Sequence, residues 1–406
     1  MIERREYLDR LVIWKDEAVI KVVTGIRRCG KSTLLKLYQD YLKSTGVSDE
    51  QIVALNFEDP ANDSLLDYKS LYNYVCERLC SGRKTYIFLD EVQNVADFQR
   101  AVDGLYIKDD TDVYITGSNA YLLSGELATL LSGRYIEISM LPFSFKEFCQ
   151  ARGAEPTDEA FSQYMTSGGF PYAVVMNQAG NKVDEYIEGI YHTVLFKDIE
   201  ERQKRREVDS ATRRVSDAVL LANISRYLAG TVGSPVSIKG ITDYLSSNGR
   251  PVSAHTVDDY TEALAEAYVY YPAERFDIMG KQLLKTNKKY YIVDLGLRNH
   301  LLPRRSYNLG FSVENVVYLE LLRRGYRVNA GKAGTAEVDF VAAKGGVVSY
   351  YQVTASMLDE NTFEREMKPL RGIADNYEKR VLTLDRFTAG NYGGIAVEHV
   401  IDWLMR

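Results

Sequence analysis

The residues best suited to chemistry lie in one eight-residue segment, Gly25 to Ser32, which reads Gly-Ile-Arg-Arg-Cys-Gly-Lys-Ser. Glycines at this spacing let the backbone turn its N–H groups toward phosphate oxygens, and a following helix adds a favourable dipole. In such a loop Lys31 would reach the β- and γ-phosphates, and the Ser32 hydroxyl would coordinate magnesium. The segment therefore predicts a site for ATP and Mg²⁺. We expect its contacts to come from Gly25, Arg28, Cys29, Gly30, Lys31, Ser32 and Thr33.

A second candidate group follows the apolar segment 85–89, where Asp90 and Glu91 stand side by side. An aspartate at the end of such a strand is placed to hold magnesium in a phosphate-loop enzyme. The adjacent Glu91 is a candidate to polarise the water that attacks the γ-phosphate. The pair predicts that ATP is hydrolysed as well as bound.

The elements that position these residues alternate between strand and helix. Apolar strands are predicted at 19–24, 51–57, 85–89, 112–116 and 135–138, and a helix is predicted from Ser32 onward. The phosphate loop thus lies between a buried strand and a helix. Another strand separates it from the strand that ends in Asp90, so the two functional strands are not neighbours in the sequence.

This arrangement resembles the additional-strand class of P-loop ATPases, and within it the AAA+ superfamily. The resemblance implies that Asn119, after the fourth strand, senses the γ-phosphate. It also implies that Arg134, just before the fifth strand, acts as an arginine finger in the same or a neighbouring subunit. More narrowly, the chain resembles a prokaryotic AAA-type ATPase family with an uncharacterised C-terminal domain. The shared segments are 23–35, 56–59, 115–119, 132–135, 141–145, 168–171 and 196–199.

Beyond residue 150, the pattern predicts three further domains. Residues 1–150 form the P-loop ATPase core, 151–218 a helical lid, 219–304 a winged helix and 305–406 an α/β domain that resembles the restriction-endonuclease core. The fold class expected is α/β. A basic cluster follows the lid helices and could contact phosphates of ATP or DNA, or form a solvated face. Its members are Arg202, Lys204, Arg205, Arg206, Arg213 and Arg214.

The third helix of the predicted winged helix is strongly acidic. It carries Asp258, Asp259, Glu262 and Glu266 and no lysine or arginine. DNA phosphates would repel such a helix, so packing against protein is favoured over reading of the major groove. The predicted wing carries Lys281, Lys285, Lys288 and Lys289, which keeps a contact with DNA open.

The C-terminal domain resembles a nuclease that has lost part of its active site. The resemblance implies that Glu314 and Asp339 occupy two of the acidic positions that hold magnesium. The third position reads Gln352-Val353-Thr354, where the family has a carboxylate and a lysine. An amide is a poor magnesium ligand, although Glu337 on the same strand face as Asp339 could supply a carboxylate. We expect nuclease activity to be absent.

Composition agrees with a folded protein of the cytoplasm. Apolar residues make up 46% and charged residues 26%, and the formal charge of -6 gives no overall attraction to nucleic acid. No apolar run has the roughly 18 residues of a membrane span, and no export signal is expected. The four cysteines form no disulfide framework, and the four scattered histidines indicate no zinc site.

Two functions follow from these patterns. The first is an ATP-binding and ATP-hydrolysing switch that acts on a protein or nucleic-acid partner, with ATP-dependent self-association possible. The alternative is an ATP-dependent DNA-processing enzyme whose C-terminal domain cuts DNA.

Overall fold

The computed structural model describes residues 2–118, 133–176, 182–194, 217–302 and 309–406. The chain divides into two compact units, one made of residues 1–141 with 266–268 and the other of residues 142–265 with 269–406. None of the described helices has the length and apolar character that crossing a membrane would require.

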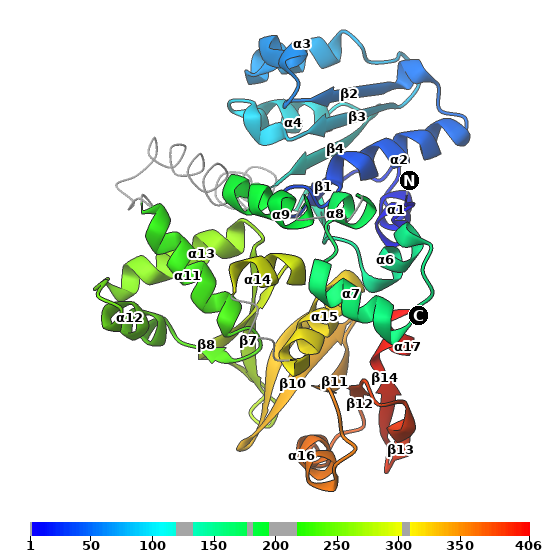
Figure 1. The fold of residues 1–406 in the computed structure, drawn as a ribbon. Coiled ribbons are helices and arrows are strands. Elements are labelled where there is room, and N and C mark those ends of the chain that lie inside the picture. Colours follow the sequence, from blue (N-terminus) through cyan, green and yellow to red (C-terminus); the bar gives the residue numbers. More distant parts are fainter. Residues whose placement is uncertain (1, 119–132, 177–181, 195–216, 303–308) are drawn as a thin grey trace. The chain divides into compact units, whose positions relative to one another are not determined.

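The first unit is built on a parallel five-stranded sheet in the order β2-β3-β4-β1-β5 (Figure 1). Its strands are β1 (Ile20–Thr24), β2 (Ile52–Asn56), β3 (Thr85–Asp90), β4 (Thr111–Gly117) and β5 (Tyr135–Ser139). All five agree with the predicted strands to within two residues. In space β4 separates β1 from β3, and β2, the strand that lies between them in the sequence, is at the edge of the sheet.

Helices cover both faces of this sheet. They are α1 (Arg5–Ile13), α2 (Lys31–Ser44), α3 (Tyr68–Cys76) and α4 (Phe98–Tyr106). The apolar faces of α3 and α4 pack with β1 to β4 in one continuous core. On the other face, the ring of Tyr38 of α2 contacts Phe88 of β3 edge-on and Tyr114 of β4 at a tilt. The three central strands β1, β3 and β4 are buried on both faces, which explains why they are largely apolar.

The second unit begins with helices and continues into a nine-stranded sheet of order β13-β14-β12-β11-β10-β9-β7-β8-β6. Its helices are α6 (Phe145–Arg152), α7 (Asp158–Ser167), α8 (Pro171–Val175), α9 (Lys182–His192), α11 (Ala218–Gly230), α12 (Ile238–Ser247), α13 (Ala254–Glu266), α14 (Leu295–Leu301), α15 (Leu309–Arg323), α16 (Glu360–Arg371) and α17 (Val400–Leu404). Its strands are β6 (Pro235–Val236), β7 (Tyr270–Asp277), β8 (Gln282–Ile292), β9 (Arg327–Ala333), β10 (Ala336–Lys344), β11 (Val347–Thr354), β12 (Glu378–Thr383), β13 (Gly390–Tyr392) and β14 (Ile395–His399).

The large sheet crosses the domain boundary that the sequence suggests at residue 304. Strand β7 pairs in parallel with β9 through Arg275 and Ala330, which join the segment 219–304 to the segment 305–406. The pairing makes them one continuous sheet, because β7 offers its free edge to β9.

Candidate functional site

The phosphate loop connects β1 to α2, and its glycines have conformations that other residues avoid. Gly25 has φ +141°, and a Cβ there would lie 2.1 Å from the carbonyl oxygen of Met140. Gly30, immediately before α2, has φ +106°. These two positions therefore need glycine, for a steric reason at Gly25 and a conformational one at both.

The Lys31 ammonium lies inside the loop and faces the acidic end of β3. Its Nζ donates to the carbonyl oxygen of Gly25 at 3.1 Å and lies 3.4 Å from Oε1 of Glu91. Burial acts to lower the pKa of Lys31, but Glu91 and the nearby Cys29 and Asp90 together raise it. Burial acts to raise the pKa of Glu91, and the opposing effects of Lys31, Gln93, Arg27 and Ser118 leave it lowered. Both groups are therefore charged at neutral pH.

Asp90 and Glu91 are joined through the hydroxyl of Thr116 on the neighbouring strand β4. Oγ1 of Thr116 donates to Oδ1 of Asp90 at 2.5 Å and accepts the N–H of Glu91 at 2.9 Å. Asp90 also shares a hydrogen bond with the Ser32 side chain, while burial raises the pKa of its carboxyl. The paired oxygens of Ser32 and Asp90 are the ligand type that Mg²⁺ prefers, so these two residues fit a magnesium site.

Glu91 has a strained backbone and a restrained side chain. Its φ is +53°, a conformation uncommon for residues other than glycine. Its Oε2 accepts from Nε2 of Gln93 at 2.6 Å and from Oγ of Ser118 at 3.1 Å. The Glu91 carboxylate is thus held by two neutral donors and one cation, an orientation that would suit a group aligning a water molecule.

Arg4 braces the phosphate loop from outside, a contact that no sequence motif announces. Its side chain donates to the carbonyl oxygens of Cys29 at 3.0 Å and Leu141 at 2.7 Å, and the residue is buried. The guanidinium therefore fixes the loop to the chain that continues from β5. An arginine before the first strand has no recognisable signal in the sequence, because its partners are backbone carbonyls far along the chain.

The remaining loop residues differ in exposure. Arg28 and Thr33 are exposed, whereas Cys29 is fully buried and burial raises the pKa of its thiol. Asn119 lies outside the described residues. The residue before it, Ser118, is buried at the end of β4 and contacts Glu91, so this strand end delivers a hydroxyl to the site.

Arg134 lies away from this group within its own chain. Its carbonyl oxygen accepts the N–H of Ile20, the first residue of β1, whereas the phosphate loop follows the last residue of that strand. The two ends of β1 are roughly 13 Å apart at the usual rise per residue. The Arg134 side chain is half exposed and pairs with Asp103 at 2.5 Å. The structure thus brings together Lys31, Ser32, Asp90 and Glu91 and leaves Arg134 at the opposite edge of the sheet.

In the second unit, the basic cluster from Arg202 to Arg214 lies outside the described residues. The acidic helix α13 exposes Asp258 and Glu262, in keeping with the expected repulsion of DNA. The expectation that Lys289 is available to contact DNA from the wing is wrong. Only 2% of the surface of Lys289 is exposed, and its ammonium contacts three carboxylates.

Those carboxylates belong to the acidic positions that the sequence singled out. The ammonium of Lys289 lies 3.1 Å from Glu314 on α15, 2.5 Å from Glu337 on β10 and 3.7 Å from Asp339 on β10. Gln352 lies beside them, and its amide oxygen accepts the N–H of Asp339 at 3.3 Å. Within the described residues, no group of three or more His, Cys, Asp or Glu side chains is arranged to hold a metal ion.

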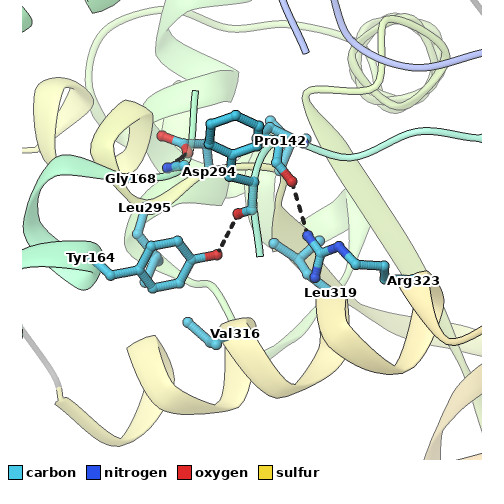
Figure 2. A pocket seen from close by; sticks show the side chains of 11 residues that line it. Pro142, Tyr164, Gly168, Asp294, Leu295, Val316, Leu319 and Arg323 are labelled. Carbon is cyan, nitrogen blue, oxygen red and sulfur yellow. Dashed lines mark hydrogen bonds between the residues drawn. The ribbon is translucent and has the colours of Figure 1, made fainter. Parts of the chain in front are cut away.

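Gly168 and Gly169, from the turn 168–171, line a small pocket (Figure 2). The carboxylate of Asp294 accepts the N–H of Gly169 at 2.6 Å and the N–H of Leu297 at 2.9 Å. A Cβ at Gly168 would lie 2.2 Å from that carboxylate. The pocket encloses about 10 Å³, the least that one water molecule needs, so this glycine motif joins α7 to α14 rather than binding a substrate.

The five-stranded order, the loop and the paired acids define the class of the first unit, a P-loop ATPase domain of the AAA type. Residues 17–149 match the model of the AAA domain family, and residues 158–308 match a domain of unknown function, DUF8612. A Haemophilus influenzae protein described as uncharacterized is 40% identical, covering 100% of this chain and 99% of its own length. The chain belongs to the family of that protein.

Two further proteins are more distant. Uncharacterized protein MJ1544 of Methanocaldococcus jannaschii is 29% identical, over 90% of this chain and 79% of its own length. Among solved structures, a Walker-type ATPase of Pyrococcus abyssi aligns with a TM-score of 0.48 and 14% identity, over 74% of this chain and 96% of that one.

Proposed function

We propose that this protein binds Mg-ATP at the phosphate loop, hydrolyses it, and uses the cycle as a switch that acts on a protein or nucleic-acid partner. The observation that carries the proposal is the pairing of Lys31 with Glu91 directly beside Asp90. The proposed phosphate-binding ammonium of Lys31 therefore contacts the candidate base Glu91, and the proposed metal ligand Asp90 is the preceding residue.

Each residue has a distinct part in the proposed reaction. Lys31 binds the β- and γ-phosphates, and the loop N–H groups between Gly25 and Ser32 bind phosphate oxygens. Magnesium, held by Ser32 and Asp90, would neutralise negative charge on the phosphates. Glu91 is ionised at neutral pH, because its pKa is lowered, so it can accept a hydrogen bond from the attacking water and orient it.

The position of Arg134 favours a role in a neighbouring subunit. An arginine at the edge of the sheet opposite the phosphate loop does not serve the loop of its own chain. Its half-exposed guanidinium can instead be offered to the ATP of a second copy. Light scattering with and without ATP tests this part of the proposal, because a trans finger requires assembly. A protein that stays monomeric at saturating ATP would contradict it.

The segments beyond the ATPase domain are proposed to bind a partner. The order α11-β6-α12-α13-β7-β8 supports a winged helix, and α15-β9-β10-β11-α16-β12 supports a restriction-endonuclease-like core. The acidic surface of α13 and the burial of Lys289 favour a protein partner over duplex DNA. Nanomolar, salt-dependent binding of duplex DNA would contradict this preference.

Two variants test the ATPase proposal directly. Lys31→Ala is expected to abolish binding of a fluorescent ATP analogue, since it removes the ammonium proposed to bind the β- and γ-phosphates. Glu91→Gln is expected to keep binding and to lose phosphate release by about 100-fold or more. Glu50→Gln, at an exposed carboxylate elsewhere in the domain, is the matched control and should hydrolyse ATP normally. Equal hydrolysis by Glu91→Gln would remove Glu91 from the mechanism.

A further inference from the structure

A buried cluster of acids in the second unit converges on a single cation supplied by the protein itself. Glu314 comes from α15, Glu337 and Asp339 come from β10, and Lys289 comes from β8. The side chains of Lys289 and Glu314 are 3% and 6% exposed, that of Asp339 is 11% exposed, and that of Glu337 is 41% exposed. Three of the four side chains are thus largely buried, and Glu337 is the member that reaches solvent.

The neighbouring hydrogen bonds hold the carboxylates in place around the ammonium. The hydroxyl of Tyr291 donates to Oε1 of Glu314 at 2.6 Å, the same oxygen that Lys289 contacts. The N–H of Val353 donates to Oδ2 of Asp339 at 2.8 Å, which leaves Oδ1 facing the ammonium. The acids are oriented toward one point, and the nitrogen of Lys289 occupies that point.

The side-chain amide of Gln352 lies beside the cluster and is hydrogen-bonded at both ends within the protein. Its amide oxygen accepts the N–H of Asp339, and its amide nitrogen donates to Oε2 of Glu366 at 2.8 Å. Both ends of the amide are used within the protein. A divalent ion would therefore gain no oxygen from Gln352 and would have to displace Lys289 to reach the carboxylates.

Electrostatics make that displacement unfavourable. The Lys289 ammonium is buried and lies within 3.7 Å of all three carboxylates. Displacing the ammonium would leave a charged group without its partners in the interior, or would place a divalent cation beside it.

We propose that the Lys289 ammonium takes the place of a divalent cation at this cluster. The native centre is then closed to metal ions, and removal of the ammonium opens it to them. The acids instead bind β8 to α15 and β10 through a charge that the chain itself carries. This inference concerns only the second unit and does not depend on ATP hydrolysis.

The test is a Mn²⁺ titration of nucleotide-free, full-length protein. Electron paramagnetic resonance measures the concentration of free Mn²⁺ at each step of the titration. All samples carry Asp90→Asn, which removes the carboxylate proposed to hold metal at the phosphate loop. With Lys289 intact, no Mn²⁺ uptake that depends on Asp339 is expected. Lys289→Met is expected to take up one Mn²⁺ per chain and to gain thermal stability on Mn²⁺ addition. Adding Asp339→Asn to Lys289→Met should abolish both effects.

The matched control is Lys21→Met, which removes a buried lysine that contacts one carboxylate, Asp112, at 2.5 Å. It should lower the melting temperature without creating a Mn²⁺ site, because one carboxylate is a weak ligand set. Absence of Mn²⁺ uptake in folded Lys289→Met would overturn the proposal. If Lys289→Met does not fold, the protein that keeps Lys289 still tests the proposal. Uptake of Mn²⁺ or plasmid cleavage that is lost in Asp339→Asn would show that the native centre is open.

Discussion

The carboxylate of Glu91 lies 3.4 Å from the ammonium of Lys31, the residue proposed to bind the β- and γ-phosphates of ATP. The proposed catalytic base and the phosphate-binding cation are therefore in direct contact before any substrate group separates them. Arrival of phosphate oxygens gives Lys31 a competing anion, which would release Glu91 toward water while Gln93 and Ser118 still hold its other oxygen.

Replacing Thr116 with valine should damage the site while preserving its shape. The change leaves the N–H of Glu91 without its acceptor and removes the donor to Asp90. We expect a loss of stability of about 1–3 kcal/mol, as for other buried groups left without partners, and slower ATP hydrolysis. Urea unfolding and steady-state phosphate release measure the two effects. Thr116→Ser keeps the hydroxyl and should retain most of the activity; equal activity of the valine variant would show that this bridge is dispensable.

Gly25→Ala should deform the phosphate loop through a steric clash. The added Cβ would meet the Met140 carbonyl at 2.1 Å, in a backbone conformation that alanine rarely adopts. The strain alone costs about 1–3 kcal/mol, and the clash adds to it. Gly46→Ala is the matched control, because Gly46 also has positive φ but nothing lies within 4 Å of its Cβ position. Isothermal titration with ATP should show lost binding for Gly25→Ala alone. Equal ATP affinity of the two variants would show that the clash at Gly25 does not affect ATP binding.

Most of the first unit could be predicted from its sequence, because its central strands are buried on both faces and its loop has a strict spacing of glycines and lysine. The fold also places Thr24, Asp90 and Gly117 at one edge through parallel registers that local patterns do not encode. Thr116 is an ordinary strand residue in the sequence. Its function follows only from the strand order, which puts it beside Asp90.

The burial of Lys289 could not be predicted for a similar reason. Four lysines within nine residues are typical of an exposed wing, and Lys289 differs from the others only by its partners, which lie 25 to 50 residues further along the chain. Strand pairing from β8 through β7 and β9 to β10 brings them together. Gln352 and Thr354, by contrast, are identified through the resemblance to the restriction-endonuclease core, and alternation adds only that residues two apart share a strand face.

Arg134 should act between subunits if ATP drives assembly. Arg134→Ala and Glu91→Gln would each hydrolyse ATP poorly alone. In a mixed assembly, a subunit with intact Glu91 can receive Arg134 from a Glu91→Gln neighbour, so mixing should restore part of the activity. Phosphate release measured against mixing ratio checks this expectation. A strictly additive response, with no recovery at any ratio, would argue against a trans finger.

Asp294 should give the second unit a characteristic dependence on pH. Burial raises its pKa to about 6, although Gly169, Leu297 and neighbouring N–H groups act in the opposite direction. In the unfolded chain the pKa is 3.8, so between pH 4 and 6 the folded state holds a proton that the unfolded state has released. The contribution of Asp294 to stability is therefore full below pH 4, falls as pH rises, and is lost above pH 6. The total change is about 3 kcal/mol.

The measurement is urea unfolding of the native protein and of Asp294→Asn from pH 4 to 7.5. The variant has no proton to release at this position, so the stability difference, native minus variant, should shrink by up to about 3 kcal/mol across this range and stay constant above pH 7. Asp385→Asn is a suitable control, because Asp385 also accepts a backbone N–H, from Met357, but lies at a more exposed position. If the stability of the native protein minus that of Asp294→Asn instead grows with pH, the N–H donors lower the pKa of Asp294 more than burial raises it. This carboxylate would then be ionised in the folded protein.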